Sequence, residues 1–166
     1  MRRVMVLLAG IAALLAVLSF SSHTTATASP PSNLQTASIP VITGQVMVPK
    51  PKFSRTMYAT TKLAGAADML DACGGPIAVN VGAGQPVLVA EHDYCGGLAW
   101  IPKLTVGDAV ELKGDGVYPG IYVVTEIRFD IRHEATVGDL PDTEAVLQTC
   151  VSKHKLILVG VNWVGV

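Results

Sequence analysis

Short apolar runs separated by turn residues follow one another along most of the chain. Five runs are rich in β-branched or aromatic residues, or alternate between apolar and polar positions, and are expected to be strands: 86–90, 109–113, 121–131, 145–149 and 156–161. Residues 45–48 and 58–63 are weaker strand candidates. The helix-forming stretch 64–72 ends at Gly74-Gly75 and predicts a short helix. Strands at this spacing predict an all-β fold, a closed or nearly closed barrel with one or two short helices.

The amino-terminal pattern is different from that of the rest of the chain. Arg2 and Arg3 precede an unbroken apolar run from Val4 to Phe20, and Ala26-Thr27-Ala28 offers a cleavage site with small residues. This is the layout of a secretory signal peptide. The run is also close to the length that spans a bilayer, so an uncleaved membrane anchor is the alternative. Both alternatives place the remaining chain outside the cytoplasm, secreted or anchored to the cell membrane.

These patterns divide the chain into three parts. Residues 1–28 form the signal peptide or anchor, residues 29–44 a flexible spacer rich in Ser, Thr and Pro, and residues 45–166 the β-barrel domain. A length of 166 residues leaves room for one such domain, and a content of 50% apolar residues argues against wholesale disorder. The net charge is −1 and no basic cluster is present, which excludes a nucleic-acid partner.

The three cysteines are an odd number for an exported protein. Cys73 and Cys95 each open a Cys-Gly-Gly triplet, whereas Cys150 stands alone. An oxidising compartment favours pairing two cysteines and leaving the third reduced. We therefore expect a Cys73–Cys95 disulfide and a free Cys150. The alternative is that all three are small buried side chains.

Two residues that end apolar strands could carry chemistry. His92 follows the run 86–90, and Cys150 follows the run 145–149. If the two strands are neighbours in a barrel, a thiolate nucleophile and an imidazole that protonates a leaving amine meet at one rim. A cationic group beside them would stabilise an oxyanion. The alternative is that this cysteine and this histidine are structural.

The surrounding residues resemble those of the sortase family over the region 86–161. The run Val87 to His92 is similar to the sortase strand that leads into the catalytic His, and Leu104 and Gly107-Asp108 are similar to the stretch that follows it. The run Leu147 to Cys150 is similar to the sortase Thr-Leu-x-Thr-Cys signature without its first Thr. Sortases carry an essential Arg on the next strand, where this chain has Lys155; His154 and Arg128 are further candidates.

The resemblance implies a cysteine transpeptidase or peptidase without a cofactor, acting as a monomer. Cys150 would form a thioacyl intermediate on a peptide or protein substrate, Lys155 would hold the oxyanion, and His92 would protonate the leaving amine. An amine acceptor at the cell wall, or water, would resolve the intermediate. The alternative is a catalytically inactive sortase-fold module that binds a peptide or the cell wall.

Residues next to His92 leave three smaller alternatives. Cys95 offers a rival thiol. His92, Asp93 and Cys95 could contribute to a metal site, although a fourth ligand at the usual spacing is missing. Asp93 could orient His92. Trp100 and Trp163 are expected to be packing residues.

Overall fold

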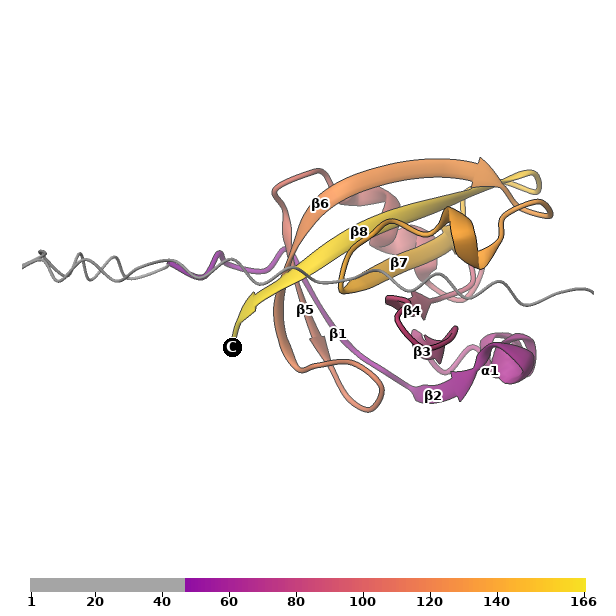
Figure 1. Ribbon diagram of the computed structural model, residues 1–166, viewed down its shortest axis with the longest axis horizontal. Helices are drawn as coiled ribbons and strands as arrows, with labels where there is room; N and C mark the ends of the chain where they lie inside the picture. The colour runs from indigo at the N-terminus through magenta and orange to yellow at the C-terminus, as the bar shows by residue number, and fades with distance from the viewer. Residues whose placement is uncertain (1–46) are drawn as a thin grey trace, which may run out of the picture. The chain divides into compact units, whose positions relative to one another are not determined.

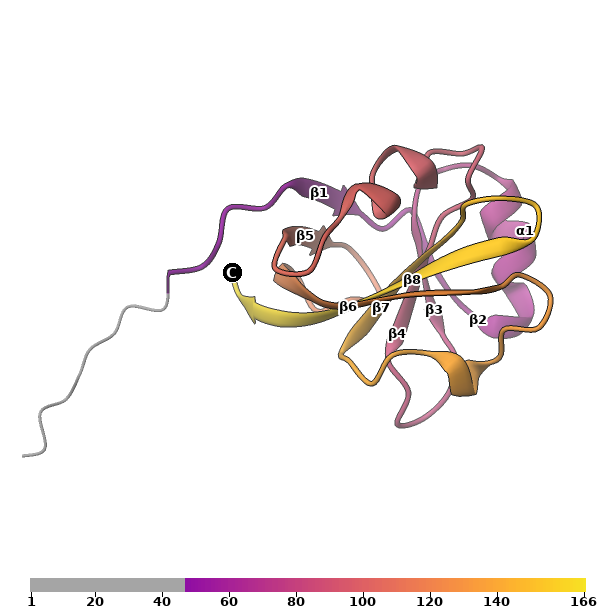
Figure 2. The same ribbon diagram turned by 90° about the horizontal axis from the view of Figure 1, so that it is seen from above.

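The computed structural model describes residues 47–166, which form one mixed sheet of eight strands in the order β1-β5-β6-β8-β7-β4-β3-β2 (Figures 1 and 2). The strands are β1 (Phe53–Thr56), β2 (Ala59–Lys62), β3 (Ile77–Asn80), β4 (Val87–Ala90), β5 (Ala109–Lys113), β6 (Gly120–Ile131), β7 (Ala145–Cys150) and β8 (Lys155–Gly165). The helical elements are α1 (Ala66–Asp71) and the 3₁₀ turns η1 (Leu63–Gly65), η2 (Gly97–Ala99), η3 (Ile101–Lys103) and η4 (Val137–Asp139). The expected signal peptide or anchor, and all of the spacer, lie outside the described residues.

The connection between β1 and β2 forces the sheet to curl. These strands are the two edges of the sheet, yet only Met57 and Tyr58 separate them. Such a connection spans at most about 11 Å, so the two edges must approach each other. The Met57 N–H donates to Lys113 O at the end of β5, and the Tyr58 N–H donates to Pro76 O before β3. The result is a nearly closed barrel, which confirms the expected all-β fold class.

The strand pattern of the sequence agrees with the structure from β4 onward. The expected strands 86–90, 109–113, 121–131, 145–149 and 156–161 correspond to β4, β5, β6, β7 and β8, and the expected helix overlaps α1. Strands β1 and β3 were not expected, and Met47 and Val48 are not in a strand. Each missed strand has four residues, and neither is an unbroken apolar run like the Val-Leu-Val-Ala of β4: β1 is Phe-Ser-Arg-Thr and β3 is Ile-Ala-Val-Asn.

The main hydrophobic core lies on the inner face of the curled sheet. It includes Val89, Trp100, Leu147, Val159 and Val161, each with no measurable exposure. On the outer face, α1 covers β3 and β4 through Ala66, Ile77, Val79 and Ala90. Within residues 47–166 no helix has the length and hydrophobicity needed to cross a bilayer.

A second part of the outer face is covered by the connection between β6 and β7. Val146, Leu156 and Leu158 are buried there, with Ala135 and Leu140 of the connection packed against them. The strands β4, β7 and β8 therefore carry apolar residues on both faces. Between the cover of α1 and the cover of the β6–β7 connection a cleft remains open, and it contains the candidate site.

Candidate functional site

The parallel pairing of β4 with β7 brings His92 and Cys150 to the same edge of the sheet. The register pairs Ala90 with Gln148, and the Glu91 N–H donates to Gln148 O at 3.1 Å. Parallel strands end at a common edge, so His92, two residues beyond Ala90, and Cys150, two residues beyond Gln148, both lie at that edge of the sheet. Both residues line the same pocket.

The disulfide between Cys73 and Cys95 is present, as expected, and Cys150 is the free cysteine of the described residues. The bridge joins the end of α1 to the loop that follows His92. Because Cys95 is bonded to sulfur, it can serve neither as a rival nucleophile nor as a thiolate ligand beside His92 and Asp93. No group of three His, Cys, Asp or Glu side chains in the described part of the chain is arranged to hold a metal ion.

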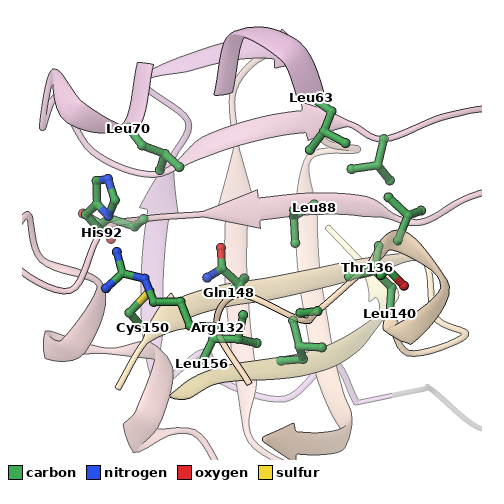
Figure 3. A pocket seen from close by; sticks show the side chains of 15 residues that line it. Leu63, Leu70, Leu88, His92, Arg132, Thr136, Leu140, Gln148, Cys150 and Leu156 are labelled. Atoms are coloured by element: carbon green, nitrogen blue, oxygen red, sulfur yellow. The ribbon is translucent and has the colours of Figure 1, made fainter. Parts of the chain in front are cut away.

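A pocket of about 370 Å³ extends over the outer face of β4, β7 and β8 (Figure 3). One end is polar and gathers His92, Arg132, Gln148 and Cys150. The remaining length is apolar, with Leu88, Leu156 and Leu158 from the strands, Leu63 from η1, Leu70 from α1, and Val137 and Leu140 from the β6–β7 connection. We call this cleft the thiol pocket. The shape and lining of the thiol pocket suit an extended, largely apolar ligand that places one polar group beside Cys150.

The cation of the thiol pocket is Arg132. It follows β6 directly, is half-buried, and its backbone N–H donates to His154 O at 3.0 Å. Figure 3 shows its guanidinium at the same end of the pocket as His92 and Cys150. Among residues 47–166 no carboxylate lies within ion-pair distance of Arg132. Its charge is therefore free to act on Cys150 or on a bound ligand.

Lys155, the cation expected from the sequence, is exposed and does not line the pocket. The reason is the alternation of side chains along β8. Leu156 and Leu158 face the thiol pocket, whereas Ile157 belongs to the inner core. A residue adjacent to Leu156 points to the opposite face, so Lys155 is directed away from Cys150. The alternative cations, Arg128 and His154, are also exposed and do not line the pocket.

Cys150 is only 6% exposed, and burial raises the pKa of its thiol. The positive charge of Arg132 opposes this effect and lowers the pKa, while the negative charge of Asp93 raises it. The neutral thiol therefore predominates at neutral pH, since the pKa of an ordinary thiol already lies above 7. Attack by sulfur requires that a base remove the proton, or that a substrate exclude water and strengthen the influence of Arg132.

His92 is held by residues of α1 and of its own loop. Its Nε2 lies 3.0 Å from Oδ1 of Asp71, and the Tyr94 hydroxyl donates to the same oxygen at 3.0 Å. The ring of Tyr94 stacks on the imidazole, with centroids 4.6 Å apart. Asp93 instead accepts a hydrogen bond from the Tyr94 N–H. The carboxylate in contact with His92 is thus Asp71, rather than the neighbour considered from the sequence.

The backbone around His92 is tightly packed. The His92 carbonyl accepts hydrogen bonds from the N–H groups of Cys95 and Gly97. A Cβ atom on Gly97 would lie 2.3 Å from Thr149 Oγ1 and 2.5 Å from Glu91 O, so only glycine fits. The buried Glu91 carboxylate accepts a 2.6 Å hydrogen bond from Trp100 Nε1. These contacts fix the loop that carries the imidazole.

Arg132 and Asp71 were not predicted as residues of the site, although the sequence contains a feature that points to each of them. Arg132 directly follows the longest expected strand, so its position depends on how far β6 extends beside β8. Asp71 lies two residues before Cys73, and the expected disulfide to Cys95 would have placed it near His92. Both signals depend on tertiary pairing rather than on local spacing.

The chain was also compared with other proteins. Comparison with known protein families, with curated proteins and with solved structures gives no match for this chain.

Proposed function

We propose that this protein is an exported cysteine transpeptidase or peptidase, in which Cys150 forms a thioacyl intermediate on a peptide substrate. The observation that carries the proposal is the presence of a free thiol, an imidazole and an unpaired guanidinium at one end of a single pocket. The resemblance to sortases around His92 and Cys150 supports the same chemistry.

Each side chain has a definite role in the proposed reaction. The Cys150 sulfur, once deprotonated, attacks the carbonyl carbon of a peptide bond, and Arg132 donates hydrogen bonds to the oxyanion that forms. The C–N bond then breaks as His92 protonates the departing amine, leaving a thioester on Cys150. A second amine, or water, attacks the thioester and loses a proton to His92, and the Cys150 thiolate leaves.

The form of the pocket favours a peptide over a small substrate. Beyond the polar end, the aliphatic side chains of Leu63, Leu88, Leu140 and Leu158 line the remaining length. Burial of an aliphatic side chain there contributes about 1.5–3 kcal/mol. The Gln148 amide, between the two parts of the pocket, is available to a backbone N–H or C=O of the substrate.

The burial of Cys150 and the raised pKa of its thiol favour a second candidate. In this alternative the chain is a catalytically inactive module that binds a peptide or the cell wall through the thiol pocket. Arg132 would then bind a carboxylate or a carbonyl of the ligand, and Cys150 would be a packing residue.

The two candidates are separated by incubating the full chain with a library of acetylated peptides and measuring the intact mass. A thioacyl enzyme gains the mass of the acyl fragment, and the adduct maps to Cys150 because the other two cysteines are bonded to each other. The Cys150→Ala variant should bind the same peptides and form no adduct. Binding without any adduct in the unsubstituted chain would contradict catalysis and support the module.

A further inference from the structure

A second pocket lies at the other end of the β4–β7 strand pair. It has a volume of about 380 Å³ and is lined by Val87, Tyr118, Tyr122, Glu144, Ala145 and Trp163. We call it the aromatic pocket. The start of β7 lines it, whereas the end of β7 carries Cys150, so about 17 Å of strand separates the two sites. Trp163 lies near the end of β8, and Figure 1 shows this end of the strand at the C-terminus, on the side of the sheet away from α1.

Three aromatic rings form the walls of the aromatic pocket. The rings of Tyr118 and Trp163 have centroids 5.1 Å apart and an interplanar angle of 83°. Tyr122 is paired with Trp163 across β6 and β8, so the two side chains lie on the same face of the sheet. Aromatic faces carry negative charge density and attract cations at close range.

One carboxylate completes the pocket. Glu144 precedes β7, and its Oε2 accepts a hydrogen bond from the Trp163 backbone N–H. Its own N–H donates to Asn162 Oδ1 at 3.1 Å, which fixes the residue against β8. Among residues 47–166 no cation lies within ion-pair distance of Glu144. Burial and the charge of Glu144 both raise the pKa of Tyr122, which agrees with a pocket of negative potential.

The hydrogen-bond donors of the pocket are largely committed to the protein itself. The Tyr122 hydroxyl donates to Tyr118 O at 2.6 Å, and Trp163 Nε1 donates to Pro119 O at 3.2 Å. The Tyr118 hydroxyl is the one side-chain donor of the lining residues without a recorded acceptor. What the pocket offers to a ligand is thus π faces and a carboxylate oxygen, which suit a cation rather than an anion or a carbonyl group.

We propose that the aromatic pocket is a binding site for an organic cation of the alkylammonium class, such as a quaternary ammonium group or a lysine side chain. The cation lies against the faces of Tyr118 and Trp163 and pairs with the free carboxylate oxygen of Glu144. The site is independent of the thiol chemistry, because no residue lines both pockets.

The test uses the two tryptophans as paired reporters in a ¹H–¹⁵N spectrum of the full chain. The indole of Trp163 lies in the pocket, whereas the indole of Trp100 is fully buried in the core. Titration with choline should shift the Trp163 indole resonance to saturation and leave Trp100 unmoved. The neutral isostere 3,3-dimethylbutanol should bind about tenfold more weakly or worse.

Two variants and a control complete the design. Glu144→Gln keeps an acceptor for the Trp163 N–H and should weaken choline binding about tenfold, and Tyr118→Leu, at an exposed position, should weaken it as well. Asp68→Asn, a change of the same charge on α1, should have no effect. The proposal is overturned by equal shifts from choline and its isostere, by unchanged affinity in Glu144→Gln, or by no shift of the Trp163 resonance.

Discussion

The two ends of the β4–β7 pair present different functional groups, although the same two strands run between them. At the carboxyl ends of these strands a thiol, an imidazole and an unpaired guanidinium meet in the thiol pocket. At the amino ends, three aromatic rings and a carboxylate without a cation meet in the aromatic pocket. Parallel pairing brings the ends of β4 and β7 together at the thiol pocket, whereas the antiparallel pairing of β6 with β8 sets Tyr122 beside Trp163 at the aromatic pocket.

The comparison shows how neighbouring elements decide what a strand end can do. The β6–β7 connection brings Arg132 to one end, and the β5–β6 connection brings Tyr118 to the other. The guanidinium of Arg132 suits a developing oxyanion, and the carboxylate of Glu144 suits a bound cation. Substitutions in the thiol pocket should therefore leave the structure of the aromatic pocket unchanged. The Trp163 indole resonance tests this, because it should keep its position in such variants.

The largest effect is expected from removal of the guanidinium. Arg132→Ala should lower the rate of thioacyl formation about 10²- to 10³-fold, the usual cost of losing one group that stabilises an oxyanion. Arg132→Lys should restore part of the rate, because it keeps the charge but not the planar fork. Single-turnover kinetics monitored by intact mass measures both variants.

Lys155→Ala is the matched control for this series, since Lys155 points to the other face of β8. Its rate should stay within about twofold of the unsubstituted chain, as expected for an exposed charge. A loss as large as that of Arg132→Ala would show that the cation of the site is Lys155. A shift of the Trp163 resonance in Arg132→Ala would break the independence of the two ends.

The second largest effect is expected from removal of the Cys73–Cys95 disulfide. Replacing Cys73 and Cys95 together by Ser removes a bridge across 22 positions of sequence and should lower the free energy of unfolding by about 3 kcal/mol. The bridge lies beside His92, so thioacyl formation should also slow, while choline binding at the other end persists. Urea unfolding monitored by circular dichroism gives the first quantity. Unchanged stability would contradict a structural role of the bridge.

Asp71 is expected to have a smaller effect because its side chain is 67% exposed. Asp71→Asn keeps a polar group beside His92 Nε2 but removes the carboxylate that contacts the ring. It should lower kcat about threefold to tenfold and leave KM unchanged, since Asp71 does not line the thiol pocket. Asp68→Asn, an exposed residue of the same helix that does not line the thiol pocket, is the control variant and should leave kcat unchanged. A change confined to KM would mean that Asp71 contacts substrate instead.

Local pattern was sufficient to predict the strands β4 to β8, the disulfide, and the placement of His92 and Cys150 at strand ends that line one pocket. These features depend on β-branched runs, on the Cys-Gly-Gly triplets and on residues that end strands. Arg132 was not predicted as the cation of the site, because the prediction of Lys155 depended on which face of the sheet each residue of β8 points to. A shift of one residue along β8 decides whether Lys155 faces the pocket, and no local signal fixes the phase of that strand.

Arg132 and Asp71 show the same dependence on tertiary structure. Arg132 reaches the thiol pocket because β6 pairs with β8 as far as Ile131 and Lys155, which places the following residue beside the pocket. Asp71 reaches His92 because the disulfide joins α1 to the loop after β4. A closed or nearly closed barrel was expected from the strand spacing, but the connection between the edge strands β1 and β2 that closes it was not, because β1 was not predicted.

The most direct test of the central claim is the pH dependence of alkylation of Cys150 by iodoacetamide, which needs no knowledge of the substrate. Arg132 lowers the pKa of the thiol and Asp93 raises it. Arg132→Gln should therefore move the profile to higher pH and Asp93→Asn to lower pH, while Lys155→Gln leaves it in place. Identical profiles for Arg132→Gln and the unsubstituted chain, or a shift in Lys155→Gln instead, would contradict the assignment of Arg132 as the charge beside the thiol.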